Sequence, residues 1–144
     1  HAEGSVRTNF DALNTYEVTR KGSKVAVLAL GDFYDLGEKT VEALSSTLGI
    51  EATLIKPYFA SGVDQNLLDN LVKDHDVIVT IEDGIIEGGW GQNIASYLGT
   101  SSARVLNYGV KKAFYDRVNI ADLMRESHLD PELIATDIKQ VLGL

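Results

Sequence analysis

Runs of apolar residues alternate with helical stripes along the chain, and their order predicts the fold. Four runs have the near-continuous apolar character of strands that are covered on both faces. They are KVAVLAL at 24–30, EATLIK at 51–56, DVIVTIE at 76–82 and ARVLNYG at 103–109. Around them, apolar side chains recur at the three- and four-residue spacing of amphipathic helices. This alternation predicts an α/β fold, a three-layer sandwich around a mainly parallel sheet.

Capping residues mark where several of the predicted helices begin or end. Gly49 follows the first helical stripe and is typical of a helix C-terminus. Asp64 precedes the second stripe as a candidate N-cap. A third helix is expected over 90–98, and Asp130 followed by Pro131 predicts the start of the last helix.

The first part of the chain follows neither the strand nor the helix period. Residues 1–14 are polar, which predicts a linker or an excised boundary, so we expect the folded domain to span 15–144. Within it, the segment TYEVTRKG at 15–22 alternates between polar and apolar residues. We expect this segment to form an edge strand that runs antiparallel to its neighbour.

Composition excludes several classes of function. The chain has 144 residues, a net charge of −8 and no cysteine. Without cysteine there are no disulfides, zinc–thiolate sites or thiol nucleophiles, which is compatible with a cytoplasmic location. The acidic balance argues against a nucleic-acid partner. The absence of an apolar run of about 18 residues argues against a membrane partner.

A glycine-rich segment, TIEDGIIEGGWGQNIASYLG at 80–99, links the third predicted strand to the following helix. Its place at the carboxyl end of a strand and at a helix N-terminus suits an anion site. However, Glu82, Asp83 and Glu87 put three carboxylates there, and no Lys or Arg lies between Asp76 and Gly99. The spacing also matches neither the dinucleotide-binding nor the P-loop pattern. We therefore expect no phosphate at this turn.

The alternative is that this segment serves packing. Its glycines would allow a tight turn and close approach to a neighbour, while its acids cap free amides. Trp90 would anchor either the core or an interface. The candidates for packing or an interface are Glu82, Asp83, Gly88, Gly89, Trp90 and Gly91. No residue is predicted as a catalytic, cofactor-binding or metal-binding residue.

Two histidines are further candidates for a functional role. His75 precedes the third predicted strand at a helix end, where we expect it to face the helix dipole and solvent. His128 lies between the last two predicted helices, and no pair of histidines has metal-ligand spacing. The residues alone thus predict an α/β module without a catalytic set of its own.

The order of the motifs resembles the C-terminal domain of thiamine-diphosphate enzymes of the transketolase family, and within it the 1-deoxy-D-xylulose-5-phosphate synthases. The resemblance covers 16–144. It is carried by KVAVLALG, GVDQNLL, HDVIVTIEDGIIEGGWGQNIASYL and VLNYGVKKAFYD. Its most specific element is the acid pair followed by G-G-x-G. Departures at 58–64 and 109–118 favour a divergent transketolase-like paralogue as one possibility.

The resemblance implies a role within a larger enzyme. In that family, thiamine diphosphate and Mg²⁺ are held by the preceding domains, and the C-terminal domain packs on them and helps to form a homodimer. The parent reaction would be condensation of pyruvate with glyceraldehyde 3-phosphate, or ketol transfer. Two alternatives stay open: the C-terminal domain of a 2-oxoacid dehydrogenase β chain, and a stand-alone module for a small anion or nucleotide.

Overall fold

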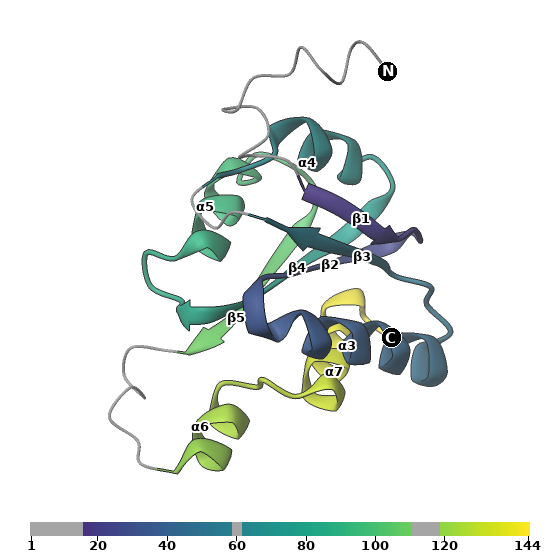
Figure 1. Cartoon of the computed structure of the whole chain (residues 1–144). Coiled ribbons are helices and arrows are strands. Elements are labelled where there is room, and N and C mark those ends of the chain that lie inside the picture. Colours follow the sequence, from purple (N-terminus) through teal and green to yellow (C-terminus); the bar gives the residue numbers. More distant parts are fainter. Residues whose placement is uncertain (1–15, 59–61, 111–118) are drawn as a thin grey trace.

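A five-stranded sheet forms the centre of the domain in a computed structural model, which describes residues 16–58, 62–110 and 119–144 (Figure 1). The strands are β1 (Tyr16–Arg20), β2 (Lys24–Ala29), β3 (Thr53–Pro57), β4 (His75–Ile85) and β5 (Arg104–Val110). Their order is β1-β3-β2-β4-β5. Strands β2 to β5 pair in parallel, and β1 pairs antiparallel with β3. The predicted parallel sheet with an antiparallel edge strand is confirmed.

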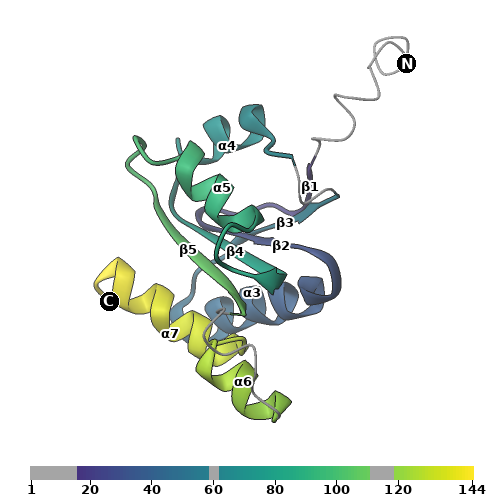
Figure 2. The same cartoon turned by 90° about the vertical axis from the view of Figure 1, so that its left-hand side faces the viewer.

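Helices cover both faces of this sheet. On one face lie α3 (Tyr34–Leu48), which follows the 3₁₀ turn η1 (Gly31–Phe33), and α7 (Pro131–Leu142). On the other lie α4 (Gln65–Leu71) and α5 (Trp90–Tyr97). The short α6 (Ile120–Glu126) leads into α7 beyond the sheet (Figure 2). The predicted three-layer sandwich is therefore confirmed.

Strand β2 shows why the apolar runs are nearly continuous. Val25 and Val27 face the cluster under α3 and α7, whereas Ala26 and Leu28 face the cluster under α4 and α5. All four side chains are fully buried. A strand in the middle of a covered parallel sheet has no solvent face, so it has no place for polar residues.

The predicted caps form as expected. The Asp64 carboxylate accepts a hydrogen bond from the Leu67 amide at 3.1 Å, and Asp130 accepts from two amides at the start of α7. Gly49 ends α3 with a left-handed φ of 67°. These local signals set the positions of three helix ends.

Two predictions concern the limits of the domain. Residues 1–14, predicted to be a linker, lie outside the described residues, as do 111–118 of the departing 109–118 segment. Among the helices that the structure describes, none is both long and apolar enough to cross a membrane.

Candidate functional site

The glycine-rich turn lies where the carboxyl ends of β2 and β4 meet. The Leu30 amide donates to the Ile81 carbonyl at 2.8 Å, which holds the two strand ends together. From β2 the chain crosses to β3 on one side of this point, and from β4 it crosses to β5 on the other side. Such a point, where the winding direction reverses, is where open α/β sheets bind ligands. The turn is therefore the first place to look for a site.

A carboxylate of the chain itself occupies the N-terminus of α5. Glu82 is 5% exposed, and its Oε2 accepts a hydrogen bond from the Gly91 amide at 2.8 Å. The Trp90 amide donates to the same carboxylate. These first-turn amides are the groups that a helix would offer to a phosphate. Because Glu82 already accepts their hydrogen bonds, an anion would have to displace it.

The neighbouring amides of the turn also have partners within the chain. The Gly88 amide donates to Gln92 Oε1 at 2.8 Å, and the Gly89 amide donates to the Ile86 carbonyl at 2.9 Å. With the two amides bound by Glu82, four consecutive N–H groups are satisfied internally. The turn is thus a closed structure and not an empty anion cradle.

Burial raises the pKa of the Glu82 carboxyl above its ordinary value, and the charge of Asp83 adds to this effect. The hydrogen bonds from Gly91 and Trp90 act in the opposite direction, because they stabilise the ionised form. Asp83 itself is exposed. Of this acid pair, the buried glutamate is the one that caps the helix.

Gly91 is required by close packing. A Cβ at this position would lie 2.5 Å from Thr80 Oγ1, 2.8 Å from Glu82 Oε2 and 3.0 Å from Asn107 Oδ1. Thr80 in turn donates a hydrogen bond to Asn107 Oδ1 at 2.6 Å, which links β4 to β5 beneath α5. The absent side chain lets the first turn of α5 rest directly on this polar group.

The other two glycines of the turn differ from Gly91. Gly88 has a φ of +74°, a left-handed conformation that glycine adopts without strain. Gly89, the N-cap of α5, is extended, with φ −84° and ψ −178°. Gly88 therefore has the tight-turn geometry expected of the glycines, and Gly91 allows the close approach of α5 to the sheet.

Trp90 lies in the core of the domain. Its side chain is 3% exposed and belongs to the cluster under α4 and α5. The indole Nε1 donates to the Tyr16 hydroxyl at 3.0 Å, and the two rings meet edge to face at 6.3 Å between centroids. Tyr16 then donates to the Gly62 carbonyl at 2.5 Å. Of its two predicted roles, Trp90 takes that of a core anchor, which ties α5 to edge strand β1.

His75 is buried, so the expectation that it faces solvent is wrong. It is 5% exposed and is the first residue of β4. Its Nδ1 lies 2.9 Å from the Leu71 carbonyl and 2.7 Å from Asp74 Oδ1, so this nitrogen carries the proton. Nε2 lies 2.8 Å from the Thr53 hydroxyl oxygen, within hydrogen-bond distance. These contacts fasten the end of α4 to the starts of β3 and β4.

His128 pairs with a carboxylate that sequence reasoning did not consider. Its Nδ1 lies 2.9 Å from Asp137 Oδ2, nine residues further along the chain. Within the described ranges, no group of three or more metal-ligating side chains lies close enough together to hold a metal ion. No spacing rule links these two positions, because the turn before α7 brings them together.

Comparisons with known proteins agree with the fold and the motifs. Residues 14–134 match the family model "Transketolase, C-terminal domain". The chain is 36% identical over 129 residues to a 1-deoxy-D-xylulose-5-phosphate synthase of Pseudoalteromonas translucida, covering 88% of this chain and 20% of that protein. It is 34% identical over 126 residues to the synthase of Vibrio atlanticus, covering 86% and 19%. The chain thus spans about a fifth of these relatives.

Solved structures show the same fold. A structure described as a split gene transketolase, inactive beta4 tetramer, superposes with a TM-score of 0.77 at 22% identity and covers 91% of this chain and 42% of the other. Transketolase from Campylobacter jejuni gives a TM-score of 0.60 at 13% identity, covering 96% and 20%. The family match extends over most of the chain. The chain belongs to the transketolase C-terminal domain family.

Proposed function

We propose that this chain is the non-catalytic C-terminal domain of a thiamine-diphosphate-dependent transferase, whose parent reaction is the condensation of pyruvate with glyceraldehyde 3-phosphate. The family match and the sequence identity to 1-deoxy-D-xylulose-5-phosphate synthases support this proposal. Because the chain spans about a fifth of those relatives, the larger remainder of the parent enzyme would carry the chemistry. Its place of action would be the cytoplasm.

One structural observation carries the non-catalytic part of this proposal. The helix N-terminus at the sheet's switch point is the place where such a fold would hold a diphosphate, and Glu82 fills it. Thiamine diphosphate and Mg²⁺ would therefore be bound by the preceding domains. The role of this domain is to pack against those domains and to support a homodimer.

The exposed side of the glycine-rich turn is our candidate for that contact. Asp83 and Gly88 are exposed there, whereas Trp90 and Gly91 are buried within the domain. A partner would thus contact the exposed carboxylates of Asp83 and Glu87 and the backbone of the turn. Replacing Asp83 with arginine should weaken self-association of the parent enzyme in light-scattering measurements. An unchanged mass over the whole concentration range would reject this contact.

The deciding experiment uses the coding region upstream of this chain. We expect it to encode a pyrimidine-binding domain with an activating glutamate and a G-D-G…N-N diphosphate motif. The full-length protein should then form the pentulose phosphate from pyruvate and glyceraldehyde 3-phosphate. If the upstream region lacks both motifs, the thiamine proposal is wrong. Ketol transfer without pyruvate condensation would instead identify a transketolase.

A further inference from the structure

Strand β5 forms one edge of the sheet, and among the described residues it pairs on one side only, with β4. The Val110 carbonyl accepts from the Ile86 amide at 3.0 Å, so the backbone groups of Val110 point toward β4. Backbone groups of successive strand residues point to opposite sides. Those of Val105, Asn107 and Gly109 therefore point away from the sheet, where the described part of the chain gives them no backbone partner. This edge can accept another strand.

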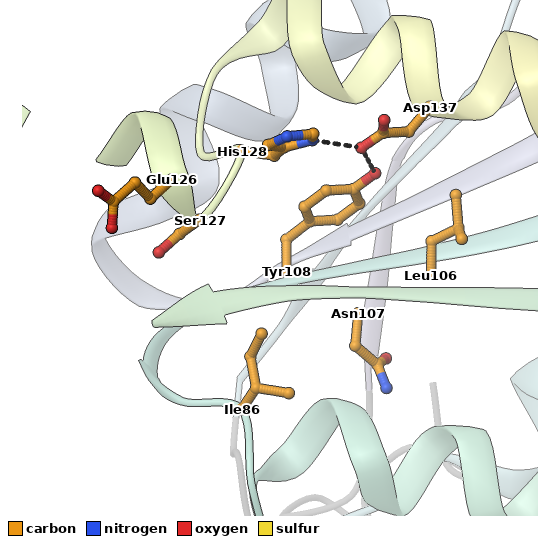
Figure 3. Close-up of a pocket in the computed structure, with 8 residues that line it drawn as sticks. All are labelled: Ile86, Leu106, Asn107, Tyr108, Glu126, Ser127, His128 and Asp137. Carbon is orange, nitrogen blue, oxygen red and sulfur yellow. Dashed lines mark hydrogen bonds and ion pairs between the residues drawn. The ribbon is translucent and has the colours of Figure 1, made fainter. Parts of the chain in front are cut away.

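A pocket of about 240 Å³ lies at the same edge (Figure 3). Its lining includes Leu106 and Tyr108, which lie on the face of the sheet that α7 covers. The lining also includes Asn107, whose side chain points to the opposite face and accepts from Thr80. Because β4 fills the inner side of β5, a pocket lined from both faces must extend around the outer edge. An added strand would lie in this space, about 4.8 Å from β5.

The two edges of the sheet differ in their protection against such pairing. β1 has five residues, carries Glu17 and Arg20, and has a register irregularity between Val18 and Arg20. Short length, charged side chains and bulges are the means by which natural edge strands avoid pairing with other chains. β5 has seven residues, and only Arg104, at its start, is charged. The chain thus protects one edge of the sheet and not the other.

We propose that β5 pairs with β5 of a second copy of this chain, antiparallel and about a two-fold axis at Asn107. In this register Val105 of one copy faces Gly109 of the other, and their outward N–H and C=O groups exchange hydrogen bonds. Leu106 of each copy lies opposite Tyr108 of the other, an apolar–aromatic pair of the kind that stabilises sheets. Identical surfaces meet, so the assembly closes as a dimer. The inference rests on this edge and does not depend on the parent reaction.

The charges at the two ends of β5 suit an antiparallel copy. Arg104, at the start, is exposed, and its guanidinium donates to the Val141 carbonyl at 3.2 Å, which leaves further N–H donors. Glu126 is exposed beside the other end of β5, where it lines the pocket (Figure 3). Antiparallel pairing brings the start of one strand to the end of the other. Each Arg104 would therefore lie near Glu126 of the second copy, whereas parallel pairing would place like charges together.

The first test is the oligomeric state of the chain, measured by sedimentation velocity over a range of concentrations, with amide hydrogen exchange followed by NMR. We expect a reversible dimer and slower exchange at Val105, Asn107 and Gly109 as the concentration rises. A chain that stays monomeric at millimolar concentration overturns the proposal. A dimer in which these three amides exchange as fast as in the monomer also overturns it, because another surface would then hold the dimer.

Charge reversal then tests the direction of pairing. Arg104→Glu places carboxylates together at each end of the paired strands and should weaken the dimer about tenfold or more. Glu126→Arg should do the same, and the double variant should restore the dimer. Lys39→Glu makes the same change of charge at an exposed site on α3 and should leave the dimer unchanged. Circular dichroism verifies that each variant is folded. If Arg104→Glu dimerises as the native chain does, or if the folded double variant stays weak, the antiparallel pairing is overturned.

Discussion

The carboxylate of Glu82 accepts the hydrogen bond of the Gly91 amide at 2.8 Å, so the end of β4 caps the helix that follows it. Between the two residues lies the glycine-rich turn, whose composition resembles that of a phosphate-binding loop. Here the negative charge belongs to the protein. The turn therefore stabilises the join between strand and helix, and the helix dipole acts on Glu82.

Removing this cap should destabilise the domain. Glu82→Ala leaves the amides of Trp90 and Gly91 buried without their acceptor, at a cost of about 1–3 kcal/mol. Asp83→Ala is the matched control, since Asp83 is the adjacent carboxylate and is exposed. Urea unfolding of both variants measures the difference. Equal midpoints would mean that the Glu82 cap contributes nothing to stability.

The raised pKa of Glu82 predicts a pH dependence of stability. A carboxyl with a raised pKa in the folded state holds its proton more tightly there than in the unfolded chain. Its contribution to stability is therefore complete below the ordinary carboxyl pKa and is lost as pH rises through the folded value. Glu82→Gln does not titrate, so the stability of the native chain relative to this variant should fall with rising pH in that window. A relative stability that rises with pH would contradict the assignment.

The polar contact beneath Gly91 leaves no room for a side chain. Gly91→Ala places a methyl group 2.5 Å from Thr80 Oγ1 and should cost about 1–3 kcal/mol through overpacking. Gly84→Ala is the control, because the nearest atom to its Cβ, Glu82 Oε1, is 3.9 Å away. Chemical denaturation of both variants should show a lower stability for Gly91→Ala than for Gly84→Ala. If Gly84→Ala is the more damaging change, close packing is not the reason for a glycine at 91.

Trp90 and Tyr16 should act as a coupled pair. Trp90→Phe removes the indole donor, while Tyr16→Phe removes its acceptor and also leaves the Gly62 carbonyl without its donor. Each change should cost about 1–3 kcal/mol, and the double variant should cost less than the sum. Strict additivity in unfolding measurements would show that the hydrogen bond between them carries no energy.

The sequence predicts those features of the fold that depend on residues close to one another along the chain. The buried strands, the caps at Asp64 and Asp130, and the capping role of an acid near α5 all follow from local patterns. The Tyr16–Trp90 hydrogen bond joins residues 74 positions apart, so no periodicity indicates it. Buried His75 likewise contacts Thr53, which comes from another strand. Contacts of this kind form only once the sheet order is set.

The pairing of His128 with Asp137 is not indicated by the sequence, for a related reason. Only the turn between α6 and α7, in which His128 has a φ of 57°, brings the imidazole onto α7. A left-handed backbone conformation at one residue of a turn is not marked by the spacing of apolar residues, so the sequence does not indicate it. The sequence therefore predicts the two helices but not this contact between the turn and α7.

Calorimetric titration of the native chain with thiamine diphosphate in the presence of Mg²⁺ tests the central claim most directly. The claim is that this domain holds no cofactor of its own, because Glu82 occupies the helix N-terminus at the switch point. We predict only the heat of dilution. A saturable isotherm with one site per chain and a micromolar Kd would contradict the account.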